Sequence, residues 1–175
     1  MDEPEIQLVR LSRDYDLASF DCGDHDLNEF IVDDALTYQK QFLANTTLLL
    51  VDGEIRTYFA LASDAIRLNP NEKNAYGIAT PLNNFPALKI ARLATHAKYR
   101  GQGFGTMALQ FCVGLARHLN DEHRHDGIGC RFITVDAYRS ALDWYLARGF
   151  IENETANNKK RDNVSLRLDA LPYED

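Results

Sequence analysis

Apolar residues recur at helical spacing in one long segment near the start of the chain. Residues 23–43 carry apolar side chains three or four positions apart, which is typical of a helix with one buried face. We expect that face to consist of Leu27, Phe30, Ile31, Ala35, Tyr38 and Phe42. Asp24 is a suitable N-cap, so the pattern predicts that this helix begins just after it.

Other segments are continuously apolar or alternate apolar with polar positions, which predicts strands. The predicted strands are residues 6–11, 46–51, 54–66, 87–95, 131–137 and 163–170. Asp52 and Gly53 separate the second strand from the third, and an Asp-Gly pair between apolar runs is a strong hairpin signal. We therefore expect an antiparallel hairpin that turns at Gly53.

Two further helices and one loop follow from the pattern. One helix begins at or near Gly105. Its buried stripe should consist of Ala108, Phe111, Cys112, Leu115 and Leu119. The other spans residues 140–150, where Ser140 and Asp143 have the spacing of a capping box and Gly149 is suited to end the helix. Residues 67–86 are rich in Asn and Pro, which predicts a long loop.

This order of elements predicts an α/β or α+β fold. A strand, a helix, three strands, a helix, a strand, a helix and a strand suggest a mixed sheet with helices on its faces. The chain has 175 residues, enough for one domain with a substantial core, and it shows no internal repeat or linker. We therefore expect residues 1–175 to form a single domain.

Composition and charge narrow the classes of function. The net charge of −7 and the pI of about 5.2 argue against a broad nucleic-acid surface and favour cationic partners such as amines. No apolar run approaches the ~20 residues of a membrane span, and the acidic start lacks the apolar core of a secretion signal. Cys22, Cys112 and Cys130 form no Cys-x-x-Cys pair, so we expect reduced thiols in a cytoplasmic protein.

The stretch YRGQGFGTMAL at residues 99–109 points to a phosphorylated ligand. Gly101, Gly103 and Gly105 allow the backbone to adopt unusual conformations and to approach a ligand closely. A helix that starts there directs N–H groups and the positive end of its dipole outward, which favours phosphate. The spacing fits neither the dinucleotide fingerprint Gly-x-Gly-x-x-Gly nor the Gly-Lys-Ser/Thr of a P-loop.

The pattern Arg100-x-x-Gly103-x-Gly105 after a strand resembles the acetyl-CoA pyrophosphate motif of the GNAT N-acetyltransferase superfamily. DWYLARGF at 143–150 resembles the family's helix with an aromatic-Tyr pair, and FDCGDHDLNEFI at 20–31 is similar to the first helix of its toxin acetyltransferases. The resemblance covers nearly the whole chain. It implies the GNAT fold, a splayed mixed sheet with helices on both faces, and acetyl transfer from acetyl-CoA to an amine.

The resemblance also implies where the cofactor binds. Backbone groups of Leu93, Ala94 and Thr95 would hydrogen-bond the pantetheine arm and polarise the thioester carbonyl. Backbone N–H groups of the glycine turn would hold the pyrophosphate, namely those of Arg100, Gly101, Gln102, Gly103, Phe104, Gly105 and Thr106. Tyr138 stands where many members have an Asn that contacts the cofactor. We expect acetyl-CoA as the co-substrate, and no metal.

Tyr145, beside Trp144, is the candidate catalytic residue. Attack of an amine on a thioester expels a thiolate, and a phenol with a pKa of about 10 is a suitable acid for a thiol with a pKa of about 8.5. No Cys or Ser stands in a nucleophile arrangement, so direct attack in a ternary complex is expected. Ordinary core packing is the alternative interpretation of Tyr145.

Several roles stay open between two interpretations. The base that deprotonates the amine could be Asp64 or a water molecule, and Asp64 could also be a turn residue. Arg92 could face an acidic group of the acceptor or an internal carboxylate. The predicted loop at 67–86 could select the acceptor, with Tyr76 and Phe85 packing against an apolar acceptor chain.

The histidines after the second helix could suggest zinc. His118, His123 and His125 with Cys130 fit no standard zinc spacing, so we expect a solvated helix end instead.

Two other functions compete with a general amine acetyltransferase. The first-helix signature suggests a toxin that acetylates the amino acid on a charged tRNA, the one case in which nucleic acid would be a partner. The other alternative is a non-catalytic module that binds acyl-CoA or a protein partner. A homodimer is one assembly that the chain could form, and no membrane contact is expected.

Overall fold

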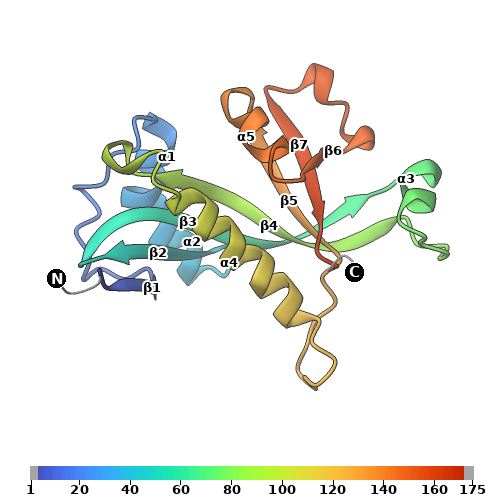
Figure 1. Cartoon of the computed structure of the whole chain (residues 1–175), viewed down its shortest axis with the longest axis horizontal. Helices are drawn as coiled ribbons and strands as arrows, with labels where there is room; N and C mark the ends of the chain where they lie inside the picture. The colour runs from blue at the N-terminus through green and yellow to red at the C-terminus, as the bar shows by residue number, and fades with distance from the viewer. Residues whose placement is uncertain (1–3, 172–175) are drawn as a thin grey trace. The chain divides into compact units, whose positions relative to one another are not determined.

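The structure is a computed structural model that describes residues 4–171 (Figure 1). The chain forms two compact units, and each is discontinuous in sequence. Unit 1 consists of the described residues up to Ala62 together with Ile90–Cys112, and unit 2 consists of Ser63–Lys89 together with the described residues from Val113 onward. Among the described residues, no helix is both long enough and apolar enough to cross a membrane.

All six predicted strands are present, with small shifts at their ends, and the sheet contains a short additional strand, β6. The strands are β1 (Ile6–Arg10), β2 (Asn45–Val51), β3 (Glu54–Arg67), β4 (Asn84–Thr95), β5 (Phe132–Tyr138), β6 (Ile151–Glu152) and β7 (Asn163–Asp169). They form an open, mixed seven-stranded sheet in the order β1-β2-β3-β4-β5-β7-β6, which confirms the predicted fold class.

The Asp52-Gly53 hairpin is confirmed. β2 and β3 pair antiparallel, and Val51 lies opposite Glu54 at the turn. Asp52 and Gly53 have φ values of 51° and 80°. A two-residue turn with both φ values positive matches the twist of the adjoining strands, which explains the Asp-Gly pair in the sequence.

The first predicted helix contains one π-helical turn. α1 (His25–Glu29) leads into the π turn η1 (Phe30–Asp34), and α2 (Ala35–Lys40) follows. The Asp24 side chain accepts a hydrogen bond from the Leu27 N–H, so the predicted N-cap is confirmed. The Ala35 N–H donates to the Phe30 carbonyl, five residues back, and this extra residue rotates everything after it.

The predicted apolar face is wrong toward the end of this segment. Phe30, Ile31 and Ala35 are buried as expected, but Tyr38 is 37% exposed and Phe42 is 91% exposed. Phe42 lies beyond the end of α2 with a φ of 58°. After the π turn, Leu36 packs against the core in place of the position that a regular helix would have buried.

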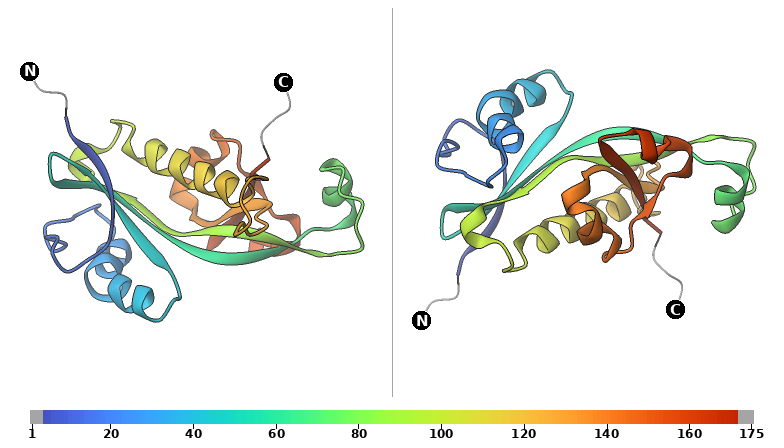
Figure 2. Two further views of the ribbon diagram at one scale, coloured as in Figure 1. Left: turned by 90° about the horizontal axis from the view of Figure 1, so that it is seen from below. Right: turned by 90° about the horizontal axis from the view of Figure 1, so that it is seen from above.

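The core of unit 1 lies between the sheet and this first helical segment. Its buried members include Leu11, Phe20, Phe30, Ile31 and Tyr58. The hydroxyl of Tyr58 donates to the Leu27 carbonyl at 2.7 Å, which fastens the helix to β3. Figure 2 shows the α1–α2 segment on one face of the unit 1 strands and the start of α4 on the other, as the resemblance implied.

Helix α4 (Phe104–Leu119) begins within one residue of the predicted start. Ala108 and Cys112 of the predicted stripe are buried, whereas Phe111 is 39% exposed. Leu109 and Ala116 are buried as well, so the inward face is displaced by about one position from the predicted stripe. The ring of Phe111 still contacts Phe59, with centroids 5.5 Å apart.

The predicted long loop at 67–86 is wrong in part, because it contains helix α3 (Pro70–Ala75). Asn69 and Glu72 form a reciprocal capping box, and Pro70 occupies the first turn, where its missing N–H costs nothing. The aromatic residues of this segment face the protein. Phe85 is buried and Tyr76 packs against the same cluster, so neither is available to an apolar acceptor chain as predicted.

The last helix is shorter than predicted. The 3₁₀ turn η3 (Arg139–Ala141) precedes α5 (Leu142–Leu146). The predicted capping box at Ser140 is wrong, because the N-cap is Ala141 and no side chain caps it. Gly149 ends the segment as predicted, with a φ of 87°, and the Phe150 N–H returns to the Tyr145 carbonyl.

Candidate active site

The glycine turn of unit 1 begins from a firmly anchored segment. After β4, the His96 N–H donates to the Arg56 carbonyl at 2.9 Å, and the Ala97 N–H donates to the Asp21 carbonyl at 2.8 Å. The 3₁₀ turn η2 (Ala97–Tyr99) follows. The start of the turn is therefore fixed both to β3 and to the connection between β1 and α1.

Two of the three glycines have the backbone conformation that requires glycine. Gly101 and Gly103 have φ values of 76° and 89°, in the left-handed region. A Cβ built on either would meet nothing within 4 Å, so the space beside them is open. Gly105 instead lies in the first turn of α4. The turn thus presents bare backbone to open space directly before a 16-residue helix.

The N-terminus of α4 directs its first N–H groups toward this turn. The first helical N–H groups of any α-helix lack carbonyl partners within the helix, and they carry the positive end of the helix dipole. The first turn of α4 contains no acidic side chain that would compete for them. Backbone N–H groups, open space and a helix dipole are the components of a phosphate site.

Arg100 has a different position from the rest of the turn. Its guanidinium donates to the Cys22 carbonyl, and its own N–H donates to the Ala97 carbonyl. The side chain therefore ties the turn to the β1–α1 connection. The N–H groups with the geometry to hold a phosphate are those that follow Arg100.

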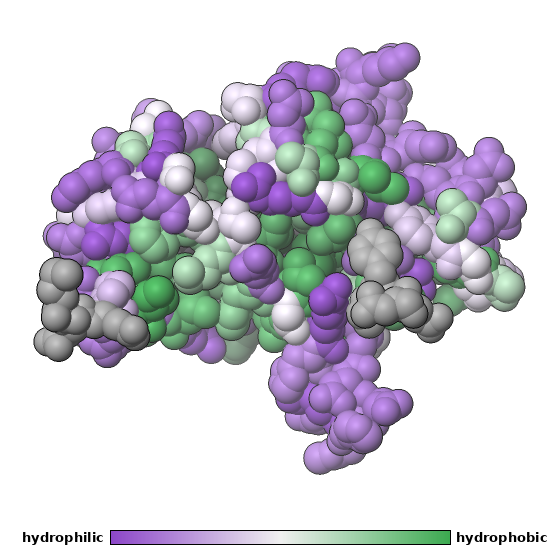
Figure 3. Space-filling model, viewed as in Figure 1, coloured by the Kyte–Doolittle hydropathy of each residue, from purple (hydrophilic) through white to green (hydrophobic). Residues whose placement is uncertain are grey.

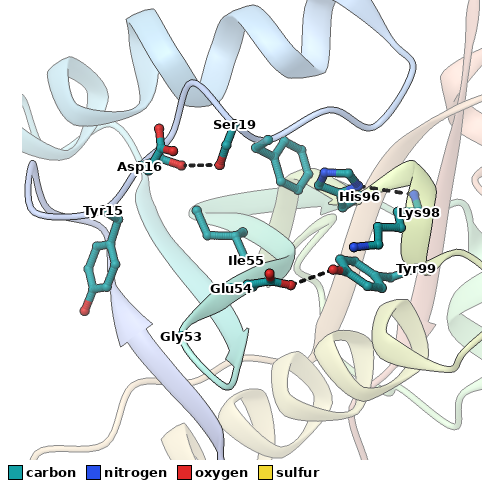
Figure 4. A pocket seen from close by; sticks show the side chains of 10 residues that line it. Tyr15, Asp16, Ser19, Gly53, Glu54, Ile55, His96, Lys98 and Tyr99 are labelled. Atoms are coloured by element: carbon teal, nitrogen blue, oxygen red, sulfur yellow. Dashed lines mark hydrogen bonds between the residues drawn. The ribbon is translucent and has the colours of Figure 1, made fainter.

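A pocket of about 460 Å³ lies beside the anchored segment within unit 1. Figure 4 shows His96, Lys98 and Tyr99 on one side, Glu54 and Ile55 below, and Tyr15, Asp16 and Ser19 opposite. The Tyr99 hydroxyl donates to Glu54 at 2.6 Å, and the Arg56 guanidinium lies 3.6 Å from the centre of the Tyr99 ring. The hydrogen bond from Tyr99, with Arg56 beside it, holds the pKa of Glu54 below its usual value. This network fixes Tyr99, the residue before the turn.

The end of β4 lies in the same unit as the glycine turn. Ala94 is buried, and Leu93 and Thr95 are half-buried. The Thr95 and Thr57 hydroxyl oxygens are 2.9 Å apart, which joins β4 to β3 at this point. Unit 1 therefore brings together Leu93, Ala94, Thr95 and the whole predicted phosphate turn.

The predicted catalytic tyrosine belongs to unit 2. Tyr145 is 6% exposed on α5, and its ring packs edge-on against Trp144 and Phe150, with centroid distances of 4.9 and 5.2 Å. Tyr138 ends β5, lies opposite Asn163 of β7, and precedes η3. The two tyrosines are thus held by one strand and the helix that follows it.

Asp64 is not a turn residue. It lies within β3, and its carboxylate accepts a 2.6 Å hydrogen bond from the hydroxyl of the buried Thr134. Among residues 4–171, no cation lies within ion-pairing distance of Asp64. Asp64 is therefore a half-buried carboxylate on the sheet of unit 2.

Arg92 contacts an aromatic ring and a backbone carbonyl. Its guanidinium lies 5.1 Å from the centre of the Phe30 ring and donates to the Ala91 carbonyl. In the described part of the chain, Arg92 forms no ion pair with an internal carboxylate.

The three histidines lie in polar surroundings. His118 contacts Arg124, and His123 is exposed beside Glu122. Figure 3 shows hydrophilic side chains covering the segment that follows α4. Cys130 is buried away from them, with its thiol against the Phe132 carbonyl. Within residues 4–171, no group of three or more His, Cys, Asp or Glu side chains is placed to hold a metal ion.

The cysteines are free thiols, as predicted, and all three are buried. Burial raises the pKa of Cys112 to about 12 and also raises the pKa of Cys22 and Cys130. None of them has the exposure or the lowered pKa of a nucleophile.

Sequence reasoning missed two groups of polar residues in unit 2. One is the buried ion pair between Glu72 and Arg167, which are far apart in the chain and leave no local signal. The other is the set of polar side chains around Asp64. A sequence signal for this set exists. Thr134, Asp136 and Tyr138 alternate with the apolar Ile133, Val135 and Ala137, which predicts polar groups on one face of this strand.

Comparison with known proteins gives one family match. The sequence model of the acetyltransferase (GNAT) family matches residues 48–150. This range includes β3, β4, the glycine turn, α4, β5 and α5. A search among curated proteins finds no match.

Several solved structures share the fold over almost the full chain. AtaT complexed with acetyl-methionyl-tRNAfMet has a TM-score of 0.77 at 21% identity, covering 94% of this chain and 95% of that chain. A Tyr-to-Phe mutant of KacT has a TM-score of 0.74 at 21% identity, with the same coverage. AtaTR bound with AcCoA has a TM-score of 0.68 at 20% identity, covering 94% of this chain and 93% of that chain.

Proposed function

This chain belongs to the acetyltransferase (GNAT) family, and we propose that it transfers an acetyl group from acetyl-CoA to an amine by direct attack in a ternary complex. The observation that carries the proposal is the turn at Gly101 and Gly103. There, two left-handed glycines expose backbone directly before α4, with open space where side chains would be. The likeness to AtaTR bound with AcCoA supports the choice of cofactor.

The proposed cofactor site has two parts in unit 1. Backbone N–H groups from Gly101 to Thr106 hold the pyrophosphate, and the backbone of Leu93, Ala94 and Thr95 hydrogen-bonds the pantetheine arm. An N–H of β4 polarises the thioester carbonyl as negative charge develops on its oxygen. Arg100 contributes by fixing the turn to the Cys22 carbonyl, since its own N–H is already used.

In the proposed reaction, the nitrogen of the neutral amine attacks the thioester carbon. The C–N bond forms, the C–S bond breaks, and the thiolate takes a proton from the Tyr145 hydroxyl. The proton lost by the amine passes to water or to a carboxylate. Tyr138 contributes a polar contact to the cofactor in place of the Asn that many members have.

The test is acetyl-CoA affinity in Gly103→Ala, measured by calorimetry. A Cβ at Gly103 meets no protein atom, so the loss should come from the occupied ligand space and from strain at a φ of 89°. We expect the dissociation constant to rise at least about tenfold. Gly53→Ala is the matched control, because Gly53 has a φ of 80° and equally open surroundings but lies in the hairpin. Unchanged affinity in a folded Gly103→Ala protein would contradict the phosphate assignment.

A second candidate acceptor is the amino acid of a charged tRNA. The likeness to AtaT complexed with acetyl-methionyl-tRNAfMet favours it, together with the similar first helix. The net charge of −7 opposes it, because tRNA binding depends on phosphate contacts. Filter binding of aminoacyl-tRNA at a series of salt concentrations separates the two candidates. If the acceptor is a charged tRNA, the affinity of the protein for tRNA should fall steeply as salt rises. If the acceptor is a small amine, the protein should acetylate that amine in the absence of tRNA.

A further inference from the structure

A cavity of about 280 Å³ opens on one face of unit 2, and its lining includes Asp64, one of the two candidates for the base. Its polar lining comes from four strands and from the connection between β6 and β7. Its charged residues are Asp64, Arg67, Lys89, Asp136 and Arg161, and Thr134 and Ser165 add hydroxyl groups. The volume suits a small molecule of a few heavy atoms.

The pairing of β5 with β7 explains why this face is polar. Thr134 lies opposite Arg167, and Asp136 lies opposite Ser165. Directly paired residues share a face, so these four polar residues lie together on one side of the sheet. Their neighbours along β5, such as Ile133 and Val135, are buried on the other side. Two strands of this unit therefore place several polar groups side by side on one face.

The charged groups in the cavity form two sites, one around Asp136 and one at Asp64. Asp136 accepts from Lys89 at 2.7 Å and from Arg161 at 2.9 Å, so one carboxylate is shared by two cations. Each of these cations has further N–H donors beyond the one directed at Asp136. Asp64 accepts from the Thr134 hydroxyl and from the Ala65 N–H, and it forms no ion pair among the described residues. Arg67 also lines the cavity, so three cations line it together with two carboxylates. The cavity thus has a surplus positive charge, and the carboxylate of Asp64 has no salt bridge.

From this arrangement we infer that the cavity binds a small zwitterionic amine. The ammonium group of the ligand pairs with Asp64, and its anionic oxygen takes the remaining donors of Lys89 and Arg161. Both uncompensated charges of the cavity are neutralised by such a ligand, whereas a simple amine or a simple acid would neutralise only one. The use of this ligand as the acetyl acceptor rests on the proposed function, but its binding does not.

The experiment is an NMR titration of the full chain with four probes of similar size. L-alanine carries both charges, isopropylamine lacks the oxyanion, L-lactate lacks the ammonium, and L-alaninamide replaces the oxyanion with a neutral carbonyl. We expect L-alanine to shift the amide signals of cavity residues such as Thr134 and Asp136. We expect each of the other three probes to bind at least about tenfold more weakly.

Two variants test which side chain binds the ammonium group of the ligand and which binds its anionic oxygen. Asp64→Asn keeps an oxygen for the Thr134 hydroxyl and removes only the charge, so L-alanine binding should weaken at least about tenfold while L-lactate binding does not weaken. Lys89→Met should weaken L-alanine and L-lactate but not isopropylamine. Asp162→Asn is the matched control, since Asp162 is an exposed carboxylate in unit 2 outside the cavity lining, and all affinities should stay at wild-type values.

Each outcome decides the inference. L-alanine shifts outside the cavity, equal binding of L-alanine and isopropylamine, or wild-type L-alanine affinity in Asp64→Asn would each overturn it. Equal binding of L-alaninamide would show that the oxyanion is not recognised and would favour an amino acid whose carboxyl group is amidated or esterified. Binding as expected without acetylation of L-alanine would count against the proposed acceptor alone. Turnover of unrelated amines at wild-type rates in Asp64→Asn would leave the proposed function intact and exclude this cavity from it.

Discussion

At the scale of single residues, the ring of Tyr145 packs in the core, and its hydroxyl is the proposed proton donor. Its ring packs edge-on against Trp144 and Phe150. A phenylalanine at this position keeps these two ring contacts and loses only the hydroxyl. A phenol hydroxyl can donate a proton to a departing thiolate, which is the chemical role proposed for Tyr145.

Replacing Tyr145 with Phe separates the packing role of the ring from the proposed catalytic role of the hydroxyl. The ring keeps its contacts, so acetyl-CoA affinity should stay within a few-fold of wild type, while turnover should fall by about 10²-fold because the thiolate leaves unprotonated. Steady-state kinetics and calorimetry measure the two quantities. Tyr15→Phe removes a hydroxyl from a half-buried tyrosine in unit 1 and should change neither. Turnover near wild type in Tyr145→Phe would assign protonation to solvent or another group.

The cysteines allow a second residue-scale prediction. Because burial raises the pKa of Cys112 to about 12, its thiolate is scarce at pH 8 and becomes abundant only as the pH approaches that value. We expect all three thiols to resist iodoacetamide at pH 8 in the native protein and to react once urea unfolds it. Mass spectrometry counts the modified thiols. Rapid native labelling of Cys112 would show that α4 opens at that position.

Residue-scale predictions from sequence succeeded where a local rule decides the conformation. Asp24 caps a helix and Gly149 ends one because only nearby backbone groups are involved. The predictions for Phe42 and Ser140 failed because each depends on how a helix winds several residues away. The π turn at residues 30–34 has no clear sequence signal, so the change of face after it could not be predicted.

At the scale of elements, α3 is held by a buried ion pair. The Arg167 guanidinium donates to Glu72 at 2.6 Å, to Asn153 at 2.9 Å, and through its Nε to the Tyr76 hydroxyl at 3.0 Å. The Arg167 and Glu72 side chains are both 3% exposed. Glu72 also closes the capping box of α3, so one carboxylate both starts the helix and fastens it to β7.

Removing one partner of this pair should destabilise the protein strongly. Glu72→Gln keeps the size of the side chain but leaves the buried Arg167 charge without a counter-charge, and we expect a loss of about 3–5 kcal/mol in unfolding free energy. Urea unfolding measures it. The double variant Glu72→Leu/Arg167→Met should recover much of the loss, because no buried charge remains. Asp126→Asn, which breaks an exposed pair with Arg124, should cost at most about 1 kcal/mol.

This pair changes the interpretation of residues 67–86. The Asn and Pro content predicted a loop free to select an acceptor, but Pro70 and Asn69 are helix-start residues, and Phe85 belongs to the core. Local composition could not reveal that Glu72 pairs with Arg167 of β7, because the two residues are 95 positions apart in the sequence. Shortening this segment would remove the counter-charge of Arg167, so such a variant would report on folding before it reported on acceptor choice.

At the scale of the whole molecule, acid should weaken unit 1 through two carboxylates. Hydrogen bonds from the Asn28 amide and the Gly23 N–H lower the pKa of Asp21, and the Tyr99 hydroxyl with Arg56 lowers that of Glu54. A carboxylate with a lowered folded-state pKa stabilises the protein above its unfolded-state pKa, and that contribution is lost as the pH falls. The affected range lies below about pH 5.

Urea unfolding at pH 7, 5 and 3 tests this expectation. Stability should fall between pH 5 and pH 3, and the fall should be smaller in Asp21→Asn, whose side chain takes up no proton over this range. Asp162→Asn serves again as the control, because Asp162 is exposed and its slope should match wild type. An equal slope in Asp21→Asn and wild type would mean that Asp21 gives no pH-dependent stability.

The architecture as a whole was more predictable than its polar contacts. Six of the seven strands and the main helices follow from apolar spacing, and the glycine turn with DWYLARGF indicated the family that the comparisons confirm. The clusters around Asp64 and Arg167 depend on strand register and order, which bring together residues distant in sequence. Periodicity identifies which face of a strand is polar, but it does not identify what lies opposite.

The way the chain alternates between its two units has a consequence for synthesis on the ribosome. The chain leaves unit 1 after Ala62, returns at Ile90, and leaves it again after Cys112. An emerging chain therefore cannot complete unit 1 from its first third, because β3 also pairs with β4, whose unit 1 residues are made only after residues 63–89 of unit 2. A nascent chain that stalls before Cys112 would expose unpaired strand edges to chaperones. A fragment that ends in this region would contain neither unit in full.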